Sequence, residues 1–105
     1  MTDLEITRLC AEVMGISVEL EYWAGVGAKV FVTGDWDEAG NHYERYHPLE
    51  DDAQAMALVK KFYLGVAFSG GWSVYEQGNG AAGHSANLNR AICLCVAKMQ
   101  QARAA

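Results

Sequence analysis

The chain is poor in the residues that mark several common classes of protein. It has one proline, three cysteines, and 8 lysines and arginines against 13 acidic residues, which gives a formal net charge of −5. An acidic surplus disfavours direct nucleic-acid binding, because affinity for a phosphate backbone comes mainly from lysine and arginine. No apolar run approaches the ~20 residues that span a bilayer, and Met1–Glu5 is acidic where a signal peptide is basic. We therefore expect a cytoplasmic protein that binds neither nucleic acid nor membrane.

The cysteines, Cys10, Cys93 and Cys95, all fall in segments with a helical pattern. Their number is odd, and no further ligands stand at the spacing that a zinc site needs. Free cysteine is among the residues most often buried. We therefore predict buried free thiols in a reducing compartment, and no metal site.

Hydrophobic residues make up 51% of the 105 residues, which suits a single folded domain spanning residues 1–105. The first expected helix runs from about Asp3 to Met14. Thr2 and Glu5 stand at the spacing of a capping box, and Gly15 is the expected left-handed residue after the helix.

The only proline, Pro48, favours extended geometry in the residue before it. The acidic run Glu50–Asp52 suits the positive end of a helix, and apolar residues at helical spacing follow as far as Tyr63. A last helix is expected from about Ser85 or Asn87 to Ala102. Every residue from 91 to 97 is apolar, so this helix is expected to be buried on most of its surface.

Alternation and β-branched residues predict strands at 16–23 and 29–33, with a weaker candidate at 41–46. Two more flank Gly70-Gly71, at 65–69 and 72–76, and residues 77–85 are expected to form a loop. The order α-β-β-(β)-α-β-β-α predicts an α+β domain: one antiparallel sheet of four to five strands packed with three helices, an α/β sandwich.

One alternative interpretation places a small-molecule or nucleotide site at the glycine-rich segment Gly78–His84. Gly78–Gly83 matches the pattern G-x-G-x-x-G between an expected strand and an expected helix. The dinucleotide fingerprint belongs to a strand–helix–strand unit with an acid about 20 residues further on. Here no acid follows, so a loop is the preferred interpretation.

The remaining polar clusters have simpler explanations than metal binding or catalysis. Asp35–Gly40 resembles the start of a calcium loop, but later ligand positions hold alanine and tyrosine. His42 and His47 would point to opposite faces of a strand, and His84 is distant. Helix capping explains Glu50–Asp52. The sequence therefore predicts no catalytic residues, no metal, no cofactor and no enzyme.

Trp36 stands in a charged loop, next to Asp35 and Asp37 and close to Tyr43. Exposed aromatic residues are frequent binding hot spots. Two interpretations stay open: Trp36 folds back over the core as a lid, or these four residues form a protein-binding site.

Three segments together resemble a family of small phage proteins: residues 3–15, residues 46–55 with their aromatic, proline and Asp-Ala helix start, and residues 89–97. In their order and spacing, they are similar to the phage ABA-sandwich domain proteins and, more distantly, to the phage NinX proteins. The resemblance implies an α/β sandwich and a phage or prophage origin in a bacterial cytoplasm. It carries over no catalytic residue.

The family resemblance implies an accessory protein that binds host proteins, with host defence or regulatory complexes as candidate targets. Our first interpretation is therefore a non-enzymatic protein that acts by binding a host or phage protein. A small-molecule or nucleotide binder and a structural homo-oligomer are the alternatives.

Overall fold

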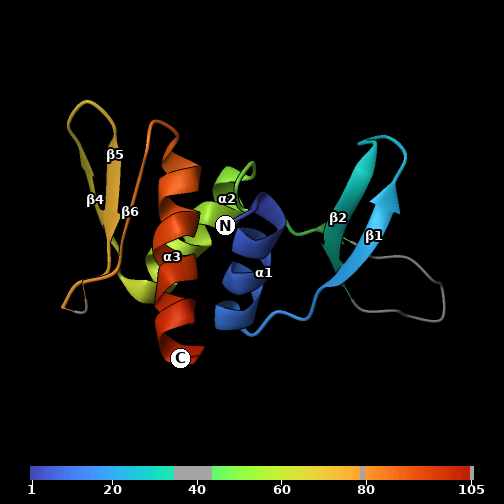
Figure 1. Ribbon diagram of the computed structural model, residues 1–105, viewed down its shortest axis with the longest axis horizontal. Coiled ribbons are helices and arrows are strands. Elements are labelled where there is room, and N and C mark those ends of the chain that lie inside the picture. The colour runs from blue at the N-terminus through green and yellow to red at the C-terminus, as the bar shows by residue number, and fades with distance from the viewer. Residues whose placement is uncertain (35–43, 79, 105) are drawn as a thin grey trace.

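The computed structural model describes residues 1–34, 44–78 and 80–104, which form an α+β arrangement with three helices and two three-stranded antiparallel sheets. In chain order the elements are α1 (Asp3–Met14), β1 (Glu19–Trp23), β2 (Ala28–Thr33), β3 (Glu44–Arg45), α2 (Asp52–Phe62), β4 (Gly65–Phe68), β5 (Trp72–Tyr75), β6 (Ala82–Ser85) and α3 (Leu88–Ala104). The three helices lie between the two sheets (Figure 1).

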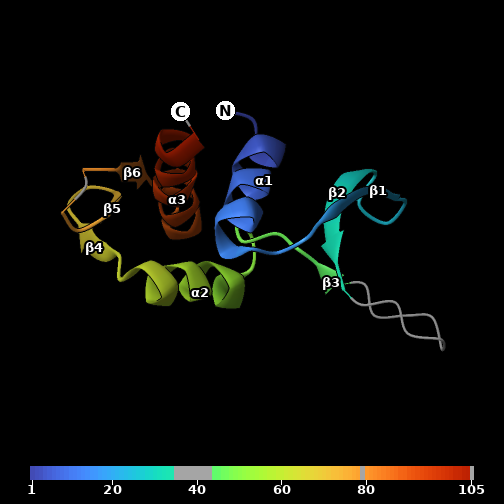
Figure 2. The same cartoon turned by 90° about the horizontal axis from the view of Figure 1, so that it is seen from below.

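The prediction of one sheet of four to five strands is wrong. The strands form two separate sheets, in the orders β1-β2-β3 and β4-β5-β6. Helix α3 lies between β6 and α1, and α2 runs below both helices, as Figure 2 shows; α3 contacts β5, β6, α1 and α2. The apolar stripes of α1 and α2 are therefore covered mainly by another helix, which a stripe alone cannot distinguish from a sheet.

Strand β6 falls inside the segment that was expected to be a loop. Its sequence, Ala-Gly-His-Ser, lacks the apolar alternation that identifies a strand. Gly83 is buried against α3 so closely that a Cβ would collide with the carbonyl oxygen of Ala91 and lie 2.7 Å from the nitrogen of Cys95. The strand uses a glycine where most strands use a large apolar residue, because the helix backbone occupies that space.

Helix α3 fills the centre of the molecule, and its segment 91–97 is buried as predicted. All three cysteines are buried free thiols, which confirms that prediction. Cys93 and Cys95 point to different sides of α3. The backbone oxygen of Cys93 accepts the thiol of Cys10 from α1, whereas the thiol of Cys95 donates to the backbone oxygen of Ala81 beside β6.

The helix starts follow the predicted capping chemistry. In α1 the hydroxyl of Thr2 accepts the backbone N–H of Glu5 at 3.1 Å, and Gly15 ends the helix with φ of 70°. In α2 the carboxylate of Asp51 accepts the backbone N–H of Gln54 at 2.9 Å. Side-chain oxygens thus satisfy N–H groups that a helix start leaves unpaired.

The β1–β2 hairpin extends from the helices on the side opposite to β4–β6 (Figure 1). Leu20 and Tyr22, which form the apolar side of the alternation in the segment 16–23, are 45% and 65% exposed. Val30 and Val32, whose side chains lie on the other face of the sheet, are buried instead. The alternation was recognised correctly, but the buried face is the opposite one.

Candidate functional site: a groove beside strand β2

A groove of about 200 Å³ lies where three separate parts of the chain meet. One wall is the first turn of α1, the second is the β1–β2 hairpin, and the third is the connection from β3 to α2. Apolar side chains from each part contribute to its lining, among them Leu4, Phe31 and Leu49. The groove is therefore an apolar concavity of the kind that holds one or two side chains of a ligand.

Strand β2 presents an open backbone edge to this groove. The backbone N–H of Tyr46 donates to the backbone oxygen of Phe31 at 2.9 Å. The backbone N–H and C=O of Phe31 therefore point toward the side of β2 on which β3 lies. In an antiparallel ladder, these directions alternate along the strand. Lys29 lies two residues earlier, opposite Tyr22 of β1. Its backbone N–H and C=O therefore also point away from β1.

No described residue pairs with the backbone of Lys29 on that side, because β3 is only Glu44–Arg45 and lies opposite Thr33 and Val32. Lys29 itself lines the groove. With respect to the described residues, the groove therefore contains a strand edge with a free N–H and a free C=O, which is the feature that an added β-strand uses.

The segment after β3 turns away from β2 because the side chain of Gln54 binds its backbone. The side-chain oxygen of Gln54 accepts the backbone N–H of His47 at 2.7 Å, and its side-chain nitrogen donates to the oxygen of Arg45 at 2.9 Å. Pro48, which is buried, follows directly. These contacts direct residues 45–48 toward α2, so that no described residue covers the edge of β2 from Lys29 toward the hairpin turn.

Among the described residues, the acidic and basic side chains that line the groove form ion pairs except at one position. Asp3 forms an ion pair with Arg90 at 2.7 Å, and Arg45 lies 3.5 Å from Glu50. Lys29 has no ion pair among the residues that the structure describes. In a protein with a net charge of −5, this wall of the groove thus offers one spare positive charge.

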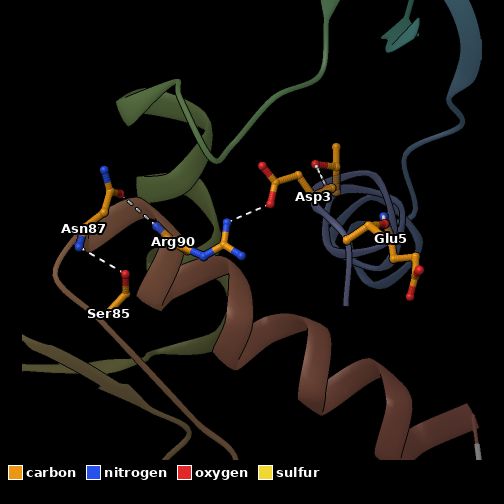
Figure 3. A network of polar contacts seen from close by, with 7 residues as sticks. Asp3, Glu5, Ser85, Asn87 and Arg90 are labelled. Carbon is orange, nitrogen blue, oxygen red and sulfur yellow. Dashed lines mark hydrogen bonds and ion pairs between the residues drawn. The ribbon is translucent and has the colours of Figure 1, made fainter. Parts of the chain in front are cut away.

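The α1 wall is fixed by a polar network at the start of α3 (Figure 3). The side-chain oxygen of Asn87 accepts the backbone N–H of Arg90 at 3.0 Å, and the N–H of Asn87 donates to the hydroxyl of Ser85 at 3.1 Å. Arg90 then reaches Asp3 in the first turn of α1. The wall is therefore tied to the central helix and is not a loose terminus.

Comparison with protein-family models, curated proteins and solved structures finds no match to this chain. The resemblance to phage ABA-sandwich proteins therefore stays a prediction.

The predicted protein-binding residues Asp35, Trp36, Asp37 and Tyr43 lie outside the described residues, in the part of the chain between β2 and β3. The calcium-like segment 35–40 and His42 lie there as well. The prediction of a binding site at these positions therefore stays a prediction.

The glycine-rich segment Gly78–His84 runs from the β5–β6 connection into β6, and α3 begins only at Leu88. Its Gly83 serves the contact with α3, and the ring of His84 lies 2.9 Å from the hydroxyl of Ser73. Within the described ranges, no cluster of three or more potential metal ligands occurs. None of the described helices is long and apolar enough to cross a bilayer.

The buried polar groups are held in their neutral forms. Burial raises the pKa of the Cys95 thiol to about 11, and a hydrogen bond with Cys10 together with burial raises the pKa of Cys93 far above its usual range. Burial likewise raises the pKa of Tyr46, whose hydroxyl has no hydrogen-bond partner among the described groups. Such thiols stay protonated near neutral pH and are weak nucleophiles.

Sequence reasoning missed the groove because its walls come from residues 3–7, 26–31 and 45–50, which no local pattern connects. One signal was present: the alternation at 41–46 is poor, so a third strand there was only a weaker candidate. A short third strand leaves part of its neighbour unpaired.

Proposed function

We propose that this protein is a non-enzymatic binding protein that captures an extended segment of a partner protein. The observation that carries the proposal is the free backbone edge of Lys29 inside an apolar groove. A partner segment would add to β2 as a strand, and its backbone would pair with the N–H and C=O of Lys29. Strand addition gives affinity through main-chain hydrogen bonds, while side-chain pockets give specificity.

The lining of the groove defines the chemistry of the preferred segment. An apolar side chain fits against Leu4, Phe31 and Leu49, and a carboxylate on the segment fits beside the unpaired Lys29. The free edge is short, so the contact is small and the affinity is expected to be micromolar or weaker, as for transient interfaces.

In this proposal, the acidic chain acts as a phage or prophage accessory protein, and its partner is a host or phage protein. The resemblance to phage accessory proteins supports this assignment, and host defence or regulatory complexes are the candidate targets. The net charge of −5 agrees with a protein rather than a nucleic acid as the partner.

A display library of short random peptides tests the proposal without knowledge of the partner. We expect selection on the wild type to enrich extended, apolar sequences with an acidic residue. Leu4→Lys and Val26→Lys place a charge in the groove at side chains that are 42% and 45% exposed, so the fold should tolerate both and binding should be lost. Leu20→Lys is the matched control, because Leu20 is 45% exposed on the same hairpin but does not line the groove.

Charge reversal supplies a second, independent readout. Lys29→Glu should shift the selected sequences from an acidic to a basic residue. The proposal fails if no peptide is enriched, or if enriched peptides bind the Leu4→Lys variant as tightly as the wild type.

A further inference from the structure

Strand β4 is an uncovered sheet edge. It is the outer strand of β4-β5-β6, and its sequence with the following turn, Gly65–Gly71, contains no charge and no proline. Natural sheets usually protect such edges with charged residues, proline or a covering element. The edge strand β1 carries glutamates, and β6 packs its face closely against α3. The edge of β4 has neither kind of protection among the described residues.

The direction of the free hydrogen-bonding groups follows from the ladder of this sheet. The N–H of Glu76 donates to the oxygen of Ala81 at 2.8 Å, so the polar groups of Glu76 point toward β6. Because these directions alternate, those of Tyr75 and Ser73 point toward β4. Their partners in the register are Gly65 and Ala67, which therefore direct their own polar groups toward β5.

Val66 and Phe68 consequently direct their backbone N–H and C=O groups away from the sheet. The bond from the N–H of Ser69 to the oxygen of Gly71, at 3.0 Å, fits the same alternation. The side chains of Val66 and Phe68 share one face and are 41% and 64% exposed. Free backbone groups and exposed apolar side chains thus occur at the same two residues.

We propose that β4 pairs with β4 of a second copy of this chain, antiparallel and about a two-fold axis at Ala67. In this register, Val66 of each copy lies opposite Phe68 of the other, and each pair exchanges both backbone hydrogen bonds. The two β4-β5-β6 sheets join into one continuous sheet. The side chains on one face form aromatic–β-branched pairs, which are favourable across strands.

A second copy fits this edge better than a foreign strand, because the edge is complementary to itself. Val66 and Phe68 carry both the outward-pointing backbone groups and the exposed apolar side chains. The two-fold register places Val66 of one copy opposite Phe68 of the other. The residue on the axis, Ala67, is small, so two copies meet without crowding. An uncharged edge also offers nothing that would select a charged partner. Because the strand is short, the dissociation constant should be on the order of 100 µM.

Cross-linking at the axis tests the register directly. Residue 67 forms a non-hydrogen-bonded pair with its symmetry mate, with Cα atoms about 4.5 Å apart, which lies within the range that a disulfide spans. Ala67→Cys should therefore form a covalent dimer under an oxidising glutathione buffer, while the native thiols stay buried. Ala24→Cys, on the exposed β1–β2 turn, is the control and should stay largely monomeric.

Sedimentation from about 10 µM to about 1 mM should show a reversible dimer of the wild type. Phe68→Lys should raise the dissociation constant at least about tenfold, whereas Leu20→Lys on the far sheet should leave it unchanged. The proposal is overturned if the wild type stays monomeric throughout, which would leave the edge for a foreign strand. It is also overturned if Phe68→Lys dimerises equally, or if both cysteine variants cross-link to the same extent.

Discussion

Gly83 is the position at which one added methyl group should disturb this fold most. A Cβ there would collide with the carbonyl oxygen of Ala91, lie 2.7 Å from the nitrogen of Cys95 and lie 3.0 Å from the Cβ of Leu94. Two of these are backbone atoms of the central helix, which cannot rotate away. Relief requires β6 and α3 to separate, and this opens an extensive contact between a strand and the central helix.

Overpacking of a close contact usually costs about 1–3 kcal/mol, and rigid backbone atoms place Gly83→Ala at the upper end or above it. A loss of about 3 kcal/mol in the free energy of unfolding corresponds to a Tm lower by about 12–24 °C for a domain of this size. Urea titration followed by tryptophan fluorescence, together with a thermal melt, measures both quantities.

Gly25→Ala is the matched control for this experiment. A Cβ at Gly25 would meet nothing within 4 Å, and the backbone there is not left-handed. The substitution should leave stability unchanged or raise it slightly by restricting the unfolded chain. Equal stability of the two variants would refute the close packing of β6 on α3.

Three further predictions concern stability. Burial raises the pKa of the Cys95 thiol from 9.0 to about 11, so the unfolded chain loses this proton first. Stability should therefore fall by about 2 kcal/mol as pH rises from 9 to 11. Cys95→Ala should reduce that alkaline loss in urea titrations at both pH values. Gln54→Leu removes two hydrogen bonds, to His47 and Arg45, and should cost about 1–2 kcal/mol in a urea titration, because the N–H of His47 loses its partner while the oxygen of Arg45 keeps the ring of His47 at 3.0 Å. Thr2→Ala removes the α1 cap and should cost about 1 kcal/mol, whereas Thr2→Ser should retain it.

The helices could be predicted from the sequence because most of the signals that define them are local. Thr2, Asp51 and Gly15 act through bonds within one or two turns, and the stripe from Ala91 to Ala97 indicates burial whatever covers it. Such local chemistry depends little on the rest of the chain.

The sheets could not be predicted equally well, because their division depends on distant contacts. Nothing in Ala82–Ser85 indicates a strand, since its place is set by the backbone of α3. Likewise, the alternation at Leu20 and Tyr22 does not say which face is covered. A pattern of apolar residues specifies a face, but only tertiary contacts specify its partner.

The two proposed surfaces lie on opposite sides of the helices, with the groove beside β2 and the free edge at β4 (Figure 1). A dimer formed through β4 would therefore leave both grooves accessible. A dimer with two weak sites binds a partner that carries two matching segments far more tightly than one site does. This arrangement would offset the small contact that each groove can make.

Amide hydrogen exchange at Lys29 tests strand addition in the groove most directly. With a peptide selected on the wild type at saturating concentration, the Lys29 amide should exchange at least about tenfold more slowly, because a new hydrogen bond protects it. The amides of Leu20 and Tyr22, on the opposite free edge of the same sheet, should not change. Unchanged exchange at Lys29 in the presence of bound peptide would contradict the account.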